Sequence, residues 1–257
     1  MKKMKKKIIT TVAIVLSAIL LVVGSIAGTM AYLRATAEVV NTFTYGKVTI
    51  SMDETLIGAD GLNVAASSQR VTGNRYKLMP GTTYVKDPVI HIGADSEEMY
   101  LFIKVDNGIA GLALTEEEKT PEKQTIHDQL LANGWKVYTN TQGVAYQTAT
   151  ETVTNSGVVI KSTSTVYYLS MADLANLEEG ETAETPRIVD GATGDVVTFT
   201  KFTTGTTPVT EASMTAYVNN NAKIGILAYA VQKSGFESIH DAAAVFATEF
   251  ASAIPNA

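Results

Sequence analysis

The stretch VIHIGADSEEMYLFIKV, residues 89–105, indicates the fold class. Its first four and last seven residues are rich in β-branched and aromatic side chains, which are typical of strands. Six small or polar residues, from Gly93 to Glu98, separate the two runs. We therefore expect two neighbouring antiparallel strands joined by a polar loop.

Similar runs predict further strands at 83–92, 134–139, 158–169, 196–202 and 222–232. Between Asn41 and Met52 the apolar residues alternate, but they move from odd to even positions near Gly46. A glycine at such a phase change suggests a bulge or a bend. The chain therefore reads as mainly β.

Helical signals are fewer and shorter. One helix is expected from Thr120 and Pro121 through Leu131, and Ser170 can cap a second. A third, starting at Ser238 or Asp241, presents Ile239, Ala242, Val245, Phe246 and Phe250 on one face and should pack on the sheet. Segments 140–156 and 179–195 are rich in Thr, Gly, Asn and Glu and are expected to be loops.

The first 31 residues have the order of a signal peptide. Five lysines precede an apolar run from Ile8 to Val23, and small residues follow. Thr29 and Ala31 fit the positions before a cleavage site, and Ala35 and Ala37 offer an alternative. We expect cleavage after Ala31 and secretion of the rest; an uncleaved membrane anchor is the other interpretation of the same segment.

The secreted part is acidic. Removal of five lysines from the 20 basic residues leaves 15 against 26 acidic residues, a net charge of −11. Nucleic acid is therefore an unexpected partner, and contact with a membrane is expected only through an uncleaved signal segment. Without cysteine, residues 32–257 must be stabilised by their core, and they fit a single domain; two small domains, divided at a charged middle segment, are the alternative.

No motif for catalysis is visible. His91, His127 and His240 are far apart and do not form a zinc-binding helix motif, and no nucleophile elbow or phosphate loop occurs. Acid runs such as Asp53-Glu54, Glu97-Glu98 and residues 116–118 are typical of solvated surface. Residues 190–195, DGATGD, are similar to a calcium loop but lack its closing Glu, so a tight turn explains them as well. We expect no cofactor, no bound metal and no enzyme.

Four blocks of sequence resemble the TasA/camelysin family of exported matrix proteins. They are residues 28–33 and 41–50, the Pro80-Gly81 turn, and residues 226–236. The matching positions are Asn41, Thr42, Phe43, Gly46, Val48, Pro80, Gly81, Tyr229, Ala230 and Gln232. Leu33-Arg34 departs from the family pattern, and residues 107–221 match nothing in it, which suggests an insertion there.

The resemblance implies export through a signal peptidase of the SipW type, a jelly-roll-like antiparallel β-sandwich, and fibres in the extracellular matrix of a Gram-positive biofilm. The partners would be further copies of the chain and other matrix proteins. The family also brings a description as a metallo-endopeptidase, and a surface adhesion or pilin-like module is a third reading.

A freed N-terminal segment offers a physical mechanism for assembly, because it can add to the open sheet edge of a neighbour. Tyr32, Leu33, Val39 and Val40 belong to this expected donor strand, which could extend to Ile50. Pairing of the segment within its own domain is the alternative, favoured for residues 43–52.

Overall fold

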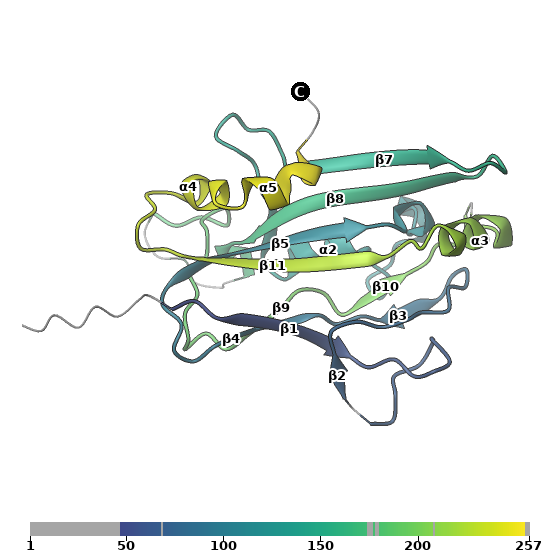
Figure 1. The fold of residues 1–257 in the computed structure, drawn as a ribbon, viewed down its shortest axis with the longest axis horizontal. Coiled ribbons are helices and arrows are strands. Elements are labelled where there is room, and N and C mark those ends of the chain that lie inside the picture. Colours follow the sequence, from purple (N-terminus) through teal and green to yellow (C-terminus); the bar gives the residue numbers. More distant parts are fainter. Residues whose placement is uncertain (1–46, 68, 174–176, 178–179, 208, 255–257) are drawn as a thin grey trace, which may run out of the picture. The chain divides into compact units, whose positions relative to one another are not determined.

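Strand-forming runs assemble into antiparallel sheets in the computed structural model, which describes residues 47–257 except 68, 174–176, 178–179, 208 and 255–257. The first sheet has the order β2-β1-β4-β9, and the second has the order β11-β5-β8-β6, with β7 also paired to β8 (Figure 1). β3 and β10 form a two-stranded sheet. The strands are β1 (Ile50–Thr55), β2 (Arg70–Val71), β3 (Thr83–Val85), β4 (Val89–Ile92), β5 (Met99–Asn107), β6 (Trp135–Val137), β7 (Gln147–Val153), β8 (Val159–Leu169), β9 (Asp195–Val197), β10 (Lys201–Thr203) and β11 (Ile224–Gln232).

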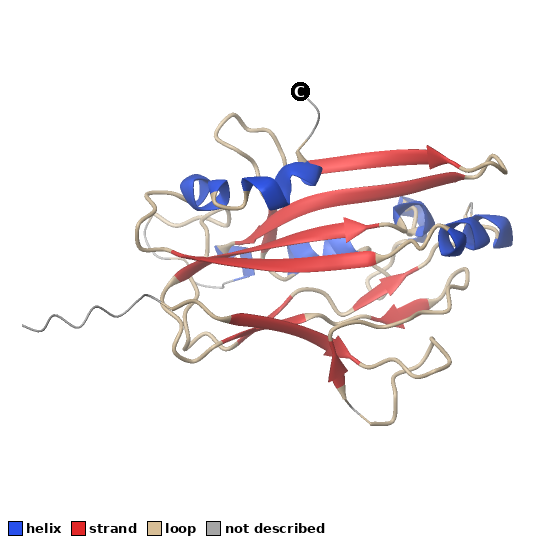
Figure 2. Ribbon diagram, viewed as in Figure 1, coloured by secondary structure: helices blue, strands red, loops and turns tan. Residues whose placement is uncertain are grey.

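The helices are few and short, as Figure 2 shows. They are α2 (Ile126–Ala132), α3 (Glu211–Asn219), α4 (Ile239–Ala244) and α5 (Ala247–Phe250), with single 3-10 turns at Ala110–Leu112, Glu116–Glu118, Met171–Asp173 and Ala251–Ala253. In the described part of the chain no helix is both long and apolar enough to cross a bilayer. The chain crosses from the first large sheet to the second after β4. It goes back to the first sheet after β8 and returns to the second at β11. The predicted fold class, a mainly β, jelly-roll-like antiparallel sandwich with a few short helices, is confirmed.

Two apolar clusters lie on opposite faces of β5. Met99, Leu101 and Ile103 are at most 1% exposed and belong to the larger cluster, which Ile90 of β4 joins from the first sheet. The alternate residues, such as Phe102, belong to a second cluster with residues of the C-terminal helices. Because side chains alternate along a strand, β5 is buried on both faces and is the centre of the fold.

The expectation that residues 89–92 and 99–105 pair with each other is wrong. β4 pairs with β1 and β9 in the first sheet, whereas β5 pairs with β11 and β8 in the second. The six-residue loop between them crosses from sheet to sheet, a distance of about 10 Å in packed sheets. Ser96 in this loop is buried, and its hydroxyl donates to the carbonyl of Thr49 at 3.2 Å. Both strands were apolar enough for the core, but their partners come from distant parts of the chain.

Two expected strands are each divided in two. The run 83–92 becomes β3 and β4, and Pro88, which has no backbone N–H, stands immediately before β4. The carbonyl of Pro88 instead accepts from the backbone and the hydroxyl of Thr198. The run 196–202 becomes β9 and β10. Residues 41–46, with the expected bend at Gly46, lie outside the described residues.

The expected loop 140–156 contains a strand. Residues of β7 pair with β8 from Gln147↔Thr165 to Val153↔Val159, and both strands are largely exposed there. A strand that extends beyond the core has no buried face, so its sequence shows no hydrophobic alternation. Gly157, with φ of 80°, lies in the turn between the two strands.

Residues 107–221, which we interpreted as an insertion, are part of the sandwich itself. They supply β8, which is hydrogen-bonded to β5 on one side and to β6 and β7 on the other. They also supply Trp135 and Phe199, both fully buried. Removal of this segment would therefore take away the middle of the second sheet.

The helices differ from the expected ones mainly at their ends. α2 begins at Ile126 rather than at Pro121, because Thr125 accepts from the backbone of Asp128 and caps it. Ser238 caps α4 as expected, but the C-terminal helix breaks at Val245, which is 54% exposed rather than on the buried face. Ser170 is followed by a single 3-10 turn, and its buried hydroxyl donates to Gly134. α3 was not expected, since its few buried side chains give no clear periodic stripe.

Phe250 shows how the C-terminal helices contribute to stability. Its ring is fully buried, 5.2 Å from the Tyr229 ring and 5.8 Å from the Phe102 ring. We expect Phe250→Ala to lower the free energy of unfolding by about 3–5 kcal/mol, measured by urea denaturation. Val245→Ala, at an exposed site, is the matched control and should change it by less than about 0.5 kcal/mol. If Phe250→Ala lowered the free energy of unfolding by less than about 1 kcal/mol, packing of these helices on the sheet would not contribute to stability.

Candidate functional site

β11 is an edge strand without the features that usually protect an edge. All nine of its residues pair with β5, from Ile224↔Asn107 to Gln232↔Met99, and no described strand pairs on its other side. Its sequence IGILAYAVQ has no charge and no proline. Natural edge strands usually carry a charge, a proline or a bulge, because unpaired backbone groups bind other strands. β11 is therefore open to strand addition.

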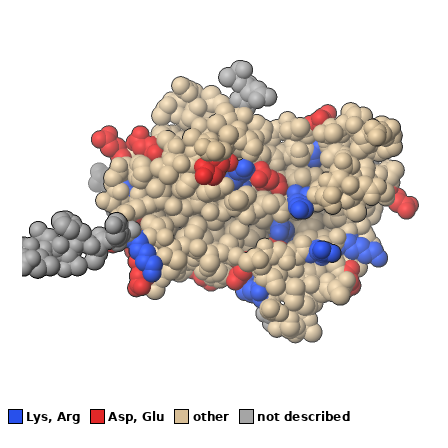
Figure 3. Space-filling view, in the orientation of Figure 1, with Lys and Arg blue, Asp and Glu red and all other residues tan. Residues whose placement is uncertain are grey.

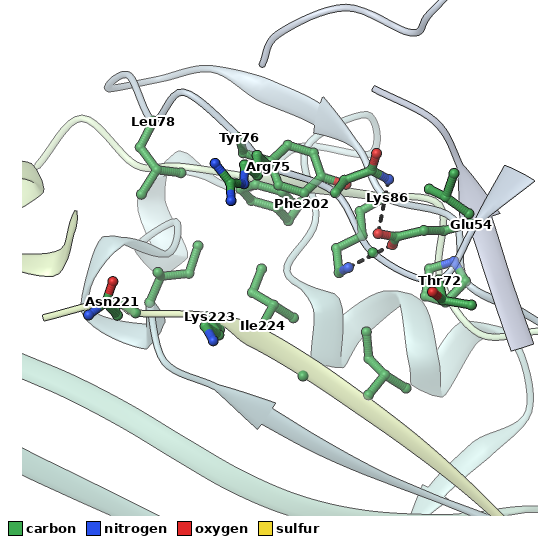
Figure 4. A pocket seen from close by; sticks show the side chains of 18 of the residues that line it. Glu54, Thr72, Arg75, Tyr76, Leu78, Lys86, Phe202, Asn221, Lys223 and Ile224 are labelled. Carbon is green, nitrogen blue, oxygen red and sulfur yellow. Dashed lines mark hydrogen bonds and ion pairs between the residues drawn. The ribbon is translucent and has the colours of Figure 1, made fainter. Parts of the chain in front are cut away.

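An opening lies beside the unpaired edge of β11, and β1 borders its other side. Ile50–Asp53 pair with β4 on one side, and only the end of β1, at Glu54 and Thr55, has a partner on the other side, in β2. A pocket of about 900 Å³ lies between the two edges, lined by residues of β1, the start of β11, residues 71–76 and Leu78. We call this opening, with the β11 edge beside it, the β11 groove (Figure 4).

The wall of the groove is mainly apolar and belongs to the core of the sandwich. Ile224 and Ile226 of β11 and Met52 of β1 pack against the larger apolar cluster. Tyr76 and Phe202 line the groove from the far side, with their ring centroids 5.1 Å apart and nearly perpendicular. An occupant of the groove would therefore bury apolar surface and could also use the unpaired backbone of β11.

One end of the groove holds a buried ion pair. Lys86 Nζ lies 2.6 Å from Glu54 Oε2, with side chains only 8% and 5% exposed. Asn74 donates to Glu54 Oε1 at 2.9 Å, and Lys86 also lies 5.9 Å from the centre of the Tyr76 ring. Burial, with the nearby charge of Glu54, raises the pKa of Tyr76 well above its ordinary value. These charges satisfy each other and form a fixed polar end to the groove.

The ion pair corrects one expectation. Asp53 and Glu54 were taken together as solvated surface, but Glu54 is 4% exposed. Because neighbouring residues of a strand point to opposite faces, Glu54 faces inward while Asp53 faces outward. No sequence signal links Glu54 to Lys86, 32 residues away.

A second polar cluster lies on the outer face of the first sheet. His91 Nε2 is 2.9 Å from Asp53 Oδ1, and His91 Nδ1 is 2.7 Å from Asp195 Oδ1. Arg70 Nε lies 2.5 Å from the same Asp53 oxygen, and Arg70 Nη1 lies 3.2 Å from Asp87 Oδ2. The hydrogen bond to Asp53, and then that to Asp195, raises the pKa of His91, and the bonds from His91 and Arg70 lower the pKa of Asp53. The cluster links β1, β2, β4 and β9.

This cluster does not have the arrangement of a catalytic triad. Ser51 stands directly opposite His91 in the β1–β4 register. Both ring nitrogens of His91 are already bonded to carboxylates, so neither can accept a proton from Ser51. The other histidines lie elsewhere, with His127 bonded to the Tyr167 hydroxyl and His240 to that of Tyr138. Among residues 47–254 that are described, no group of three His, Asp or Glu side chains is placed to hold a metal ion.

The DGATGD segment forms a turn. Asp190 Oδ1 accepts from the backbone of Ala192 and from the hydroxyl of Thr193, a local pattern typical of Asx turns. Asp195, which would be a further ligand of a calcium loop, is bonded to His91. The turn therefore accounts for Asp190, and the bond to His91 accounts for Asp195.

The residues named from sequence fall into two sets. Tyr229, Ala230 and Gln232 all lie on β11, with Ala230 facing the larger cluster and Tyr229 facing the smaller one. Val48 packs against the larger cluster, and Pro80-Gly81 forms the turn before β3, where Gly81 has φ of 66°. The remaining positions, Ala31, Tyr32, Leu33, Ala37, Val39, Val40, Asn41, Thr42, Phe43 and Gly46, lie outside the described residues.

Comparison with known proteins gives no family for this chain. No protein-family model, no curated protein and no solved structure matches it. The resemblance to the TasA/camelysin family therefore stays a prediction.

The histidine cluster predicts a specific dependence on pH. A raised pKa in the folded state means that protonated His91 adds stability below about pH 6.5, and that this stability is lost as pH rises through the folded pKa. We expect His91→Gln to lower the free energy of unfolding more at pH 6 than at pH 9, measured by urea denaturation. His127→Gln is the control with the opposite sign, because burial lowers the pKa of His127. Equal losses for His91→Gln at the two pH values would contradict the assignment.

The buried ion pair predicts strong coupling between its partners. Lys86→Met leaves the Glu54 carboxylate buried without its cation, so we expect a loss of about 3–5 kcal/mol in the free energy of unfolding. The double variant Glu54→Gln/Lys86→Met removes both charges and should recover most of that loss. Additive losses in this double-mutant cycle, measured in urea, would show that the two side chains do not interact.

Proposed function

We propose that this chain is a secreted structural protein of the extracellular matrix, which assembles into fibres when a strand from one copy adds to the β11 edge of the next. The observation that carries the proposal is the β11 groove. A nine-residue, charge-free edge lies beside an opening to the core, so one added strand would gain both backbone hydrogen bonds and apolar burial. An enzyme would not need such an edge.

The N-terminal segment has the pattern that such a strand requires. From Leu33 to Val39 the odd positions are Leu, Ala, Ala and Val, whereas the even positions between them are Arg, Thr and Glu. Strict alternation of this kind is typical of a half-buried strand. The 15 residues 32–46 can extend over about 50 Å, more than the roughly 30 Å of β11.

Export would control the timing of assembly. Before cleavage the segment remains attached to the apolar run that ends near Val23, and it becomes free only when the signal peptidase cuts after Ala31. The acidic secreted part, at a net charge of −11, also opposes non-specific association, so assembly would depend on this particular contact.

Deletion of residues 32–40 from the secreted protein tests the proposal. We expect a folded monomer with an unchanged free energy of unfolding, because the described fold begins at Lys47, and we expect no fibres by electron microscopy. N-terminal sequencing of the unaltered secreted protein, expected to begin at Tyr32, is the accompanying control. Fibres of normal yield from the deletion variant would overturn strand addition by this segment.

Two other results would replace the proposal. A protein that stays monomeric at high concentration and binds a glycan or a protein ligand saturably would be an adhesion module. Casein cleavage that a chelator abolishes, and that single changes at His91, His127 or His240 remove, would identify a metallo-endopeptidase.

A further inference from the structure

Two cations at the mouth of the β11 groove have no ion partner within the described part of the chain. Arg75 lines one wall and Lys223 the other, and both are exposed. Figure 4 shows them at the same end of the pocket, away from Glu54 and Lys86. Lys86, which also lines the groove, is paired with Glu54, and Arg70 nearby is paired with Asp53 and Asp87. In Figure 3 several Lys and Arg side chains gather over this part of the face.

Strand alternation along β11 gives the direction of Lys223. On β11 Ile224 and Ile226 point to the larger cluster, so Lys223 lies on the opposite, outward face with Leu227. Arg75 lies in the segment between β2 and β3, which is not a strand, and its side chain is exposed. A matching strand would have apolar residues on its inner face and a carboxylate on its outer face.

The N-terminal segment contains one such carboxylate. Glu38 is the only acidic residue between Tyr32 and Gly46, and its neighbours are Ala37 and Val39. When Ala37 and Val39 face the groove, Glu38 faces outward, on the same side as Lys223. A shift of one residue would turn the apolar residues to solvent, and a shift of two would move Glu38 by about 7 Å from Lys223.

We propose that Glu38 of a second copy of this chain forms an ion pair with Lys223, and that this ion pair fixes the register of the added strand. The inference rests on the proposed function and adds to it the residue that aligns the two copies. The apolar side chains supply the burial, but alternating Ala, Ala and Val differ too little in shape to select one register. The charge of Glu38 therefore distinguishes one register of the added strand from the others.

Cross-linking tests the position directly, because the chain has no cysteine of its own. One tagged secreted copy carries Glu38→Cys, and a second copy with a tag of different mass carries Lys223→Cys. After co-assembly and mild oxidation we expect a disulfide-linked dimer that contains both tags, since residues opposite each other on neighbouring strands have Cβ atoms about 5 Å apart. Lys123→Cys, also at an exposed lysine, replaces Lys223→Cys in the control and should give at least tenfold less of this dimer.

Charge reversal tests the energetics. We expect Glu38→Lys to raise the critical concentration for fibre formation about fivefold to tenfold, and Glu38→Lys/Lys223→Glu to return it to within about twofold of the unaltered protein. Glu38→Lys/Lys123→Glu makes the same change in net charge away from the groove and should not restore assembly.

The outcomes separate this inference from the proposed function. If fibres need residues 32–40 but Glu38→Lys assembles normally, or if Lys123→Glu restores assembly as well as Lys223→Glu, the register assignment is wrong and strand addition stands. If the unaltered secreted protein forms no fibres, both are overturned.

Discussion

The burial of β5 on both faces is the constraint on which the rest of the structure depends. One face of the strand contributes Met99, Leu101 and Ile103 to the core between the sheets, and the other contributes Phe102 to the layer under α4 and α5. A strand with two apolar faces needs a sheet on one side and a further cover on the other. The first sheet and the C-terminal helices meet these two needs, and the β11 edge is the border that neither of them covers.

The first sheet is stabilised differently, because its strands are short and its outer face is polar. Asp53 receives hydrogen bonds from both Arg70 and His91, which brings β1, β2 and β4 together, and Asp195 extends the cluster to β9. In a domain without cysteine, such cross-strand contacts take the place of covalent links between short elements. Glu54 and Lys86 do the same on the inner side, next to the groove.

Much of the fold could be predicted from sequence, and the errors have physical causes. Periodicity located β5, β8 and β11 and the cap at Ser238, since in these places a buried face repeats regularly along the chain. It could not say that β4 and β5 lie in different sheets, because partner choice depends on strands that are distant in sequence. It missed β7, which has no buried face, and the pair of Glu54 with Lys86, which no local pattern announces. The groove was likewise invisible, because a sequence does not show which strand is left at an edge.

The open edge of β11 has a consequence for the geometry of the proposed assembly. The groove and the N-terminal segment are different surfaces of one chain, so the proposed contact between copies would be heterologous and would not close into a symmetric pair. A filament built this way is polar: one terminal subunit keeps an empty groove, and the other keeps an unbound N-terminal segment. The two ends would then elongate at different rates. A chain that lacks the N-terminal segment could not insert into the groove of a neighbour. It could only bind the unbound N-terminal segment at one end of the filament and stop growth there.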